Sequence, residues 1–346
     1  MDWSSEQTRL FRKSWSTHCL RGWLSQDNQT DFKDAPTPDW FSKSDCVGIE
    51  VFEPADVPAA LDEIRSRGFK NAVFKLDLSA SGRGQRLFET DSSLSQSDEA
   101  WLRSVFKASE NGTFASKAGF AQQAIAVLEP ELERVVDLSF LWDVRLAKGD
   151  SVQELAIDDQ MSEDSENGIA LTKYLGWTRT LVTAGRKYTG SRLSMPFVDC
   201  VPEVRQFLLA NRAEKLEAIS NWIAPRLASE LYSRNFSGYF GVDAFLFRGS
   251  GGELLVKPVV EFNPCMTMGH VALELQKKVA PGVVSEFRIL AESQWRQLPD
   301  SIKEAPLTTI KDGRWSSGII RLSEVDENTK LVPFVLIGRC CLENQC

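Results

Sequence analysis

The order of apolar and polar positions predicts a mixed succession of short strands and helices. Apolar residues recur at helical spacing over 9–24, 56–67 and 202–234, and short apolar runs mark strands at 46–52 and 70–78. Asp56 stands where a helix cap is expected, and Gly68 where that helix should end. The segment 46–78 is therefore predicted to be strand–helix–strand, and the long helical stretch is expected to break near Pro225.

The second half of the chain adds a hairpin and several shorter elements. Two apolar runs within 238–263 flank a glycine-rich turn, which is the pattern of two antiparallel strands. Residues 98–108 and 270–280 are expected to be helical, 122–150 to form two strands, and the residues after 306 to form short strands. The acidic stretch 157–168 is expected to be an exposed turn.

Composition and charge narrow the class of protein. The chain has 346 residues, 42% of them hydrophobic and 25% charged, as in ordinary soluble globular proteins of one to three domains. Its net charge of −8 argues against a general nucleic-acid-binding protein, although a local basic groove stays open. No apolar run approaches the roughly 18 residues of a membrane span, and the N-terminal stretch has no apolar signal core. We therefore expect a cytoplasmic protein without membrane contact.

Cysteine and histidine give little support for metal or nucleophilic chemistry. The seven cysteines show no metal-type spacing, and their odd number without a secretion signal predicts free thiols. The two histidines, His18 and His270, leave little for a histidine metal site or a serine–histidine triad. Lysines, carboxylates and a glycine-rich loop remain as candidates.

The first candidate is the stretch AVFKLDLSASGRGQRLF at residues 72–88. It places Lys75 near the end of a strand and follows it with a loop of small residues, which contains Ser79, Ser81, Gly82, Arg83 and Gly84. Such loops let backbone N–H groups approach phosphate oxygens, and a nearby lysine supplies charge. The order of residues is not that of a Walker loop. A phosphate loop and an ordinary hairpin turn both stay open on these residues alone.

A second group of candidates is carboxylates at strand ends. In AVLEPELERVVDLS, a strand leads into Glu129, and Asp137 follows in the next strand. A strand edge can bind a planar base through its backbone, and a carboxylate can accept hydrogen bonds from an amino group or from ribose hydroxyls. A surface loop with solvated acids is the alternative interpretation.

The third group lies on the predicted hairpin. Asp243 interrupts an apolar strand, and Glu261 and Asn263 share one face of the facing strand because of the two-residue repeat. A carboxylate among apolar neighbours is costly unless it is paired or bound to metal. Two carboxylates and an amide oxygen on one face suit Mg²⁺, which prefers oxygen ligands. The alternative is a polar stripe that faces solvent.

Taken in order, these pieces resemble the ATP-grasp superfamily, and they are most similar to its carboxylate–amine ligases, including peptide ligases. The resemblance covers roughly residues 10–280 and rests on the lysine and its SASGRG loop, then LEPEL with DLS, then GVDAF, then VEFNP with TMG. It implies an α+β fold in which two lobes with antiparallel sheets clamp ATP. The expected divisions are 1–125 for the first lobe, 126–285 for the second, and 286–346 for an extension of short strands.

The resemblance also implies roles for individual residues. Lys75 would contact the α- and β-phosphates, the loop Ser79–Gly84 would close over the β- and γ-phosphates, and Lys13 would be a second phosphate-binding lysine. The adenine amino group would face Glu129, the backbone of Leu132 would contact the base, and Asp137 would bind the ribose. The Mg²⁺ ligands would be Asp243, Glu261 and Asn263.

The resemblance implies a reaction in which the γ-phosphate of ATP activates a small-molecule or peptide carboxylate as an acyl-phosphate. An amine then attacks the acyl-phosphate, which gives an amide or peptide bond, ADP and phosphate. Basic residues between the lobes are candidates for binding the substrate carboxylate: Arg179, Arg186, Lys187 and Arg192. Relatives often carry arginine where this chain has Cys265, and Arg83, Arg192 or Arg234 is expected to replace it. The expected catalytic residues are therefore Lys75, Arg83 and Arg192.

The resemblance leaves two functions open. The usual front domain of the superfamily is expected to be missing, reduced, or replaced by a second copy or a partner chain. Cys265 and this missing domain favour an ATP-binding scaffold without turnover, whereas the intact Lys75 and acidic cluster favour a ligase.

Overall fold

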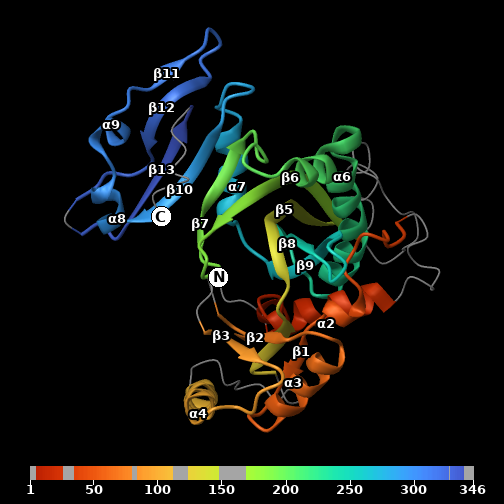
Figure 1. Cartoon of the computed structure of the whole chain (residues 1–346). Coiled ribbons are helices and arrows are strands. Elements are labelled where there is room, and N and C mark those ends of the chain that lie inside the picture. Colours follow the sequence, from red (N-terminus) through yellow and green to blue (C-terminus); the bar gives the residue numbers. More distant parts are fainter. Residues whose placement is uncertain are drawn as a thin grey trace.

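Two antiparallel sheets organise the protein (Figure 1). The computed structural model describes residues 5–25, 35–79, 84–111, 124–147, 169–326 and 328–338. The smaller sheet has the strand order β1 (Ile49–Val51), β4 (Ala126–Pro130), β2 (Asn71–Leu76) and β3 (Gln85–Glu89). The helices α3 (Asp56–Ser66) and α4 (Gln96–Asn111) pack on it around a core that includes Phe74, Phe88 and Leu128.

The two local signals around α3 have different outcomes. Gly68 has a φ of +92° directly after the helix, as expected for a glycine that ends it. Asp56 is the first helical residue, and its carboxylate accepts the backbone N–H groups of Phe52 and Glu53 at 2.8 and 3.0 Å. It therefore fixes the turn that leads into the helix rather than capping the first helical N–H groups.

The larger sheet has nine strands among the described residues. In spatial order they are β11 (Thr308–Thr309), β12 (Trp315–Arg321), β13 (Leu331–Ile337), β10 (Ser285–Ala291), β7 (Tyr188–Ser194), β6 (Ile169–Val182), β5 (Glu133–Ala147), β8 (Gly238–Arg248) and β9 (Leu254–Asn263). The segment expected as a separate extension, 286–346, contributes three whole strands and most of β10 to this sheet. The short helices α8 (Glu292–Gln297) and α9 (Asp300–Lys303) connect β10 to β11.

The N-terminal helices α1 (Ser5–Arg9) and α2 (Lys13–Ser25) precede the small sheet in sequence, but α2 packs against the large one. The ring of Trp15 lies 4.7 Å from that of Phe262, and Trp23 contacts both Phe262 and Trp222. The hydroxyl of Ser16 also accepts the N–H of Phe262 at 3.0 Å. Residues 1–125 were expected to form one lobe, and the apolar side of α2 instead joins it to the core of the other.

The helix α6 (Pro202–Ser233) covers the same face of the large sheet as α2. It is interrupted at 210–213, where Asn211, Arg212 and Ala213 have positive φ values, and not at Pro225 as expected. Proline removes one helical hydrogen bond, but Ile223, Leu227 and Leu231 on either side of it are buried against the sheet. This burial holds the helix together across the proline.

The opposite face of the large sheet carries α7 (Met268–Gln276). Ala272 packs with Leu193 and Phe287, and a Cβ on Gly269 would lie 3.1 Å from Leu141. This face turns toward the small sheet. Among the described residues, no helix is both long enough and apolar enough to cross a membrane.

One glycine is essential where β7 meets β10. A Cβ on Gly190 would lie 2.0 Å from the carbonyl oxygen of Phe287, which belongs to the neighbouring strand and cannot move freely. We expect Gly190→Ala to lower the free energy of unfolding by about 3 kcal/mol or more. Gly22→Ala, in α2 with open space around its Cβ position, should leave it unchanged or raise it slightly. Urea denaturation of both variants tests this, and equal stability of the two would contradict it.

Candidate functional site

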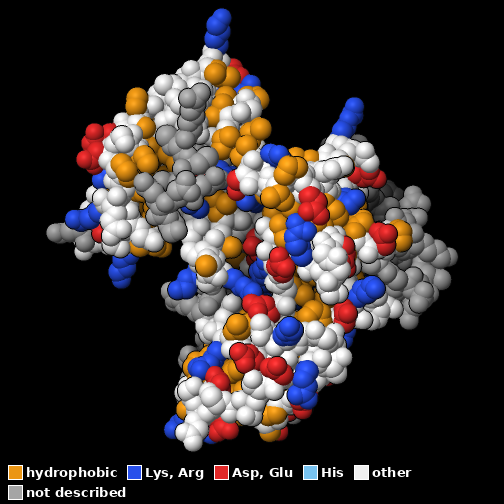
Figure 2. All heavy atoms as spheres, in the orientation of Figure 1, with side chains coloured by type: hydrophobic (Ala, Val, Ile, Leu, Met, Phe, Trp, Pro, Cys, Tyr) orange, Lys and Arg blue, Asp and Glu red, His pale blue; other side chains and the backbone are white. Residues whose placement is uncertain are grey.

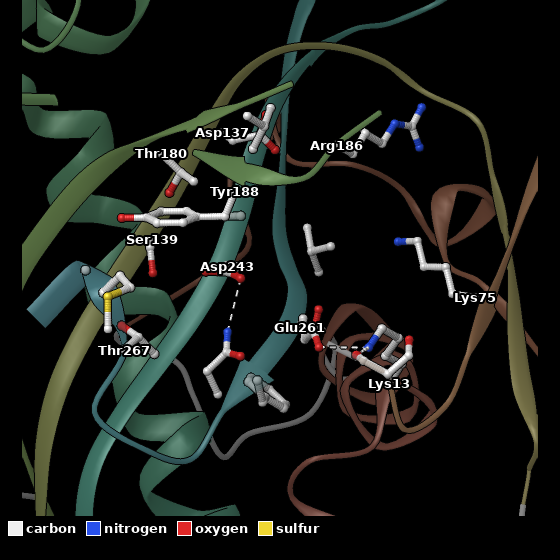
Figure 3. A pocket seen from close by; sticks show the side chains of 18 of the residues that line it. Lys13, Lys75, Asp137, Ser139, Thr180, Arg186, Tyr188, Asp243, Glu261 and Thr267 are labelled. Atoms are coloured by element: carbon white, nitrogen blue, oxygen red, sulfur yellow. Dashed lines mark hydrogen bonds and ion pairs between the residues drawn. The ribbon is translucent and has the colours of Figure 1, made fainter. Parts of the chain in front are cut away.

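A cleft of about 860 Å³ lies between the two sheets. Seven of the residues expected at a nucleotide and metal site line it (Figure 3): Lys13, Lys75, Ser79, Asp137, Asp243, Glu261 and Asn263. Figure 2 shows basic and acidic side chains interspersed on one face of the molecule, including its waist between the lobes. The cleft thus gathers charged groups from segments up to about 250 residues apart in sequence.

Lys75 belongs to a buried row of three charged side chains. Glu129 accepts from Lys75 Nζ at 2.9 Å through Oε1 and from Lys257 Nζ at 2.9 Å through Oε2. All three side chains are at most 5% exposed. Because two ammonium groups share one carboxylate, the row Lys75–Glu129–Lys257 carries a net positive charge at the wall of the cleft.

The charges in this row shift each other's titration. Burial lowers the pKa of Lys75 to about 8, with Arg134 and Lys257 adding repulsion, while Glu129 opposes the shift. Burial alone would raise the pKa of Glu129, but Lys257 and Lys75 hold it well below its usual range. Glu129 therefore stays ionised, and Lys75 is still mostly charged at neutral pH.

Lys13 stands at the first turn of α2 and bridges two parts of the cleft. Its Nζ donates to the carbonyl of Ser79 at 2.6 Å and to Glu261 Oε1 at 2.9 Å. Asp77, just before the loop, accepts from the backbone N–H of Ser14 at 2.7 Å. The start of α2 and the start of the loop are thus held together, and Asp77 is a residue that the sequence did not single out.

The acidic pair lies on the β8–β9 hairpin, as predicted. Asp243 and Glu261 are register partners, and Asn263 Nδ2 donates to Asp243 Oδ2 at 3.1 Å. Burial raises the pKa of Asp243 to about 7, and repulsion from Glu261 and then from Asp137 adds to this, against hydrogen bonds from Ser139 and Asn263. Lys13 compensates Glu261 at 2.9 Å, whereas Asp243 keeps the repulsion that raises its pKa.

This donor set fits Mg²⁺. The described residues contain no group of three or more His, Cys, Asp or Glu side chains arranged around one metal position. The hairpin offers two carboxylates and one amide oxygen instead, which are oxygen ligands and leave positions for water or phosphate. Asp243, Glu261 and Asn263 would hold the ion.

Asp137 lies on the cleft face of β5 with a basic neighbour. Arg134 Nη1 donates to Asp137 Oδ1 at 3.0 Å, and its guanidinium lies 4.1 Å from the centre of the Phe245 ring.

At the tip of the β6–β7 hairpin, Arg186 donates to Glu131 Oε1 at 3.0 Å. The same carboxylate accepts from Asn71 of the small sheet at 3.0 Å. Glu131 therefore connects the hairpin tip to the small lobe.

Several expected residues lie elsewhere. Glu129 and Leu132 are buried beside the cleft and do not line it, and both oxygens of Glu129 are bound to lysines. Gly84 closes the loop, with φ +67° and its Cβ position 2.4 Å from Leu76. Ser81, Gly82 and Arg83 lie outside the described residues, as does the acidic stretch 157–168.

The structure places Arg192 away from the cleft in which it was expected. Strand alternation turns Ser191 toward Tyr188, which lines the cleft, and turns Arg192 to the opposite face of the sheet. There its guanidinium lies 2.5 Å from Glu286 and 3.3 Å from Asp199. Arg179 is its register partner on the same face and also pairs with Asp199. Neither arginine reaches the cleft, and Arg186 does.

The sequence also missed several groups in the cleft. Ser139, Thr180, Tyr188 and Thr267 add hydroxyl groups near Asp243 (Figure 3). Ser139 stands two residues after Asp137, so the strand repeat places it on the same face. Thr180 and Tyr188 reach the site through the pairing of β5, β6 and β7, for which the sequence holds no direct signal. Cys265 is an exposed free thiol that lines the cleft.

Comparison with known proteins gives matches among solved structures alone. No family model and no curated protein matches the sequence. N5-carboxyaminoimidazole synthetase from Staphylococcus aureus with ADP aligns at a TM-score of 0.45 and 15% identity, over 96% of this chain and 68% of that one. Biotin carboxylase from Campylobacter jejuni in a β-γ-ATP complex aligns at 0.49 and 11%, over 96% and 64%. The chain thus spans about two thirds of the length of these proteins.

The architecture itself meets the expectation from the sequence. Two lobes with antiparallel sheets face each other across one cleft, and the segments that carry the resemblance line or border it. Lys75 and Ser79 come from the small lobe, and Asp137, Asp243 and Glu261 from the large one. The chain therefore has the two-lobed α+β architecture that the resemblance of its motif order to the ATP-grasp superfamily implies.

Proposed function

We propose that the protein is an ATP- and Mg²⁺-dependent ligase that activates a carboxylate and joins it to an amine. One observation carries the proposal. The row Lys75–Glu129–Lys257 leaves positive charge on one side of the cleft, while Asp243 and Glu261 repel each other on the other side. A triphosphate with its magnesium ion satisfies both needs at once, because its oxygens meet the lysines and its cation meets the acids.

The residues of the cleft divide the binding of such a nucleotide among them. Lys13 and Lys75 would hold the phosphates, as the positions of their ammonium groups allow, and the loop that begins at Ser79 would close over them. The segment Glu129–Leu132 would meet the base with its backbone, since the Glu129 carboxylate is already bound on both sides. Asp137 would accept from the ribose hydroxyls.

The chemistry follows from charge and position. Bound Mg-ATP would supply its γ-phosphoryl group to the substrate carboxylate, which gives an acyl phosphate and ADP. The amine would then attack the acyl carbon and displace phosphate, which leaves the amide. Lys75 and Lys13 would neutralise charge on the phosphoryl oxygens, and Asp243, Glu261 and Asn263 would hold the ion, which would supply further positive charge for the phosphates. Closure of the small lobe over these groups would exclude water, and the contacts from both lobes would hold the reacting atoms in line.

The substrates are a small-molecule or peptide carboxylate and an amine. Of the basic residues considered for the carboxylate, Arg186 lines the cleft, whereas Arg179 and Arg192 face away from it. Arg186 is half-buried at a hairpin tip, and its partner Glu131 would be exchanged for the substrate carboxylate. Arg83 stays a candidate for the role of the arginine that relatives often carry at the position of Cys265.

A scaffold that binds ATP without turnover is the second candidate function. Cys265 favours it, because this position lines the cleft beside Asn263 and has no guanidinium to steady an acyl oxygen. Arg234, considered as a replacement, pairs with Glu230 and lies over the ring of Trp15, away from the cleft.

Calorimetry of ATP binding with Mg²⁺ and with EDTA tests the proposal. We expect binding that requires Mg²⁺ for full affinity, followed by phosphate release that rises when pooled carboxylic acids and amines are added together. Binding without release in any pool would support the scaffold. If ATP does not bind under either condition, both functions are refuted.

A further inference from the structure

Lys257 is a buried lysine that neither the motif pattern nor the proposed chemistry explains. It lies in β9, is 2% exposed, and sits beside an apolar cluster that includes Leu132, Phe245 and Leu255. An ammonium group in such surroundings is strongly unfavourable unless a partner compensates its charge. Its partner is Glu129, 2.9 Å away and 128 residues earlier in the chain.

The contact joins the two lobes at the wall of the cleft. Lys257 comes from the large sheet, whereas Glu129 and Lys75 come from the neighbouring strands β4 and β2 of the small one. Each oxygen of Glu129 takes one lysine, both at 2.9 Å. Lys75 lines the cleft, and Lys257 does not. In the part of the chain that the structure describes, Lys257 therefore acts on the site through Glu129.

This arrangement changes what Lys75 can offer to a ligand. If Glu129 had Lys75 as its one partner, the two would form a neutral pair and an incoming phosphate would compete with the carboxylate. With Lys257 on the second oxygen, Glu129 is already neutralised, and the charge of Lys75 remains available to the cleft. We infer that Lys257 is a positioning residue. It pairs with the Glu129 oxygen that Lys75 does not bind, so that Lys75 presents an uncompensated ammonium group to a phosphate. The inference rests on the proposed function.

The charges around Lys75 give the inference a signature in pH. Glu129 from β4, Lys257 from β9 and Arg134 from β5 act on it, and burial with the two cations lowers the pKa of Lys75 to about 8. Cys46 beside Lys257 stays a neutral thiol, because burial raises its pKa to about 12. Loss of Lys257 removes one repulsion, so Lys75 should keep its proton to a higher pH.

The test uses Lys257→Met, which keeps most of the length of the side chain and removes its charge. Calorimetry at pH 7 with Mg²⁺ should show that ATP binds to this variant about tenfold more weakly than to the wild type. The loss reflects one charged hydrogen bond, because the Glu129 carboxylate then competes with the phosphate for Lys75. The pH above which affinity declines should move upward from its wild-type value near 8. Lys257→Arg should bind as the wild type does, and Lys173→Met, on an exposed part of β6, is the matched control.

A second substitution separates positioning from simple structural support. In Lys257→Met/Glu129→Gln the carboxylate is gone, Lys75 is released, and affinity should return to within about threefold of the wild type. A double variant as weak as the single one, with no shift in the pH profile, would overturn the inference. If the wild type binds ATP and Lys257→Met binds equally well, the inference alone fails. A wild type that does not bind ATP refutes the proposed function instead.

Discussion

Lys75→Ala is expected to weaken ATP binding about a hundredfold, at a cost of about 2–3 kcal/mol. Lys75 is the one member of the buried row that lines the cleft, so its loss removes the ammonium that would meet the phosphates. Glu129 and Lys257 would then form a neutral pair, and the surplus positive charge would vanish with the side chain. The substitution therefore removes both a contact and the local field.

Calorimetry of Mg-ATP binding measures this loss, and Lys173→Ala is the control because that lysine is exposed on β6. The fold should survive in Lys75→Ala, since Glu129 keeps Lys257 as a partner at 2.9 Å. Unchanged affinity in a folded Lys75→Ala protein would mean that the phosphates bind elsewhere.

The pH dependence adds an independent reading of the same residue. Burial lowers the pKa of Lys75 to about 8, so the ammonium loses its proton as the pH rises through that value. Wild-type affinity for ATP should accordingly fall above pH 8, and Lys75→Ala should lack this decline. A decline of equal size in both proteins would assign it to another group.

The local sequence pattern was sufficient to predict site residues that lie within one hairpin or one loop. The hairpin 238–263 contains its own turn and repeat, so the pairing of Asp243 with Glu261 follows from sequence spacing and is present in the structure. The loop after Lys75 is equally local, and Gly84 closes it with a positive φ. These features depend on backbone geometry that a few neighbouring residues determine.

Contacts between segments that are far apart in sequence could not be predicted from local patterns. The face that Arg192 occupies depends on a bulge between β6 and β7 and on Glu286, almost a hundred residues later. The Lys257–Glu129 contact depends on how one sheet meets the other, and no single segment encodes it. The break in α6 lies at 210–213 and not near Pro225, where the sequence predicted it. Burial of the neighbouring side chains against the sheet outweighs the hydrogen bond that the proline removes.

Asp243→Asn and Glu261→Gln are both expected to reduce Mg²⁺-dependent phosphate release by about a hundred- to a thousandfold, because each removes one charge that fixes the ion against the phosphates. Their effects on the metal-free protein should have opposite signs. Asp243 suffers from burial and from repulsion by Glu261, whereas Glu261 compensates Lys13 at 2.9 Å. One carboxylate is thus a cost to the fold, and the other supports it.

The sign for Asp243 follows from its titration. The pKa is about 7 in the folded protein and near 4 in the unfolded chain, so ionisation favours unfolding. Metal-free wild type should therefore lose stability as the pH rises from about 4 to 7 and stay at the lower level above 7. Asp243→Asn lacks this loss. At pH 8 its free energy of unfolding should exceed that of the wild type by about 2 kcal/mol. This value is smaller than the full pKa difference implies, because water in the cleft screens part of the repulsion.

Glu261→Gln should instead lower the free energy of unfolding by about 1–2 kcal/mol, since the buried ammonium of Lys13 keeps the Ser79 carbonyl but loses its counter-charge. Urea denaturation in EDTA at pH 5 and pH 8 measures both effects, and phosphate release with Mg²⁺ measures the common one. Full activity in either variant would refute the metal assignment. If Asp243→Asn is no more stable than the wild type at pH 8, Asp243 and Glu261 do not repel each other measurably. A bound cation would then have no repulsion to relieve.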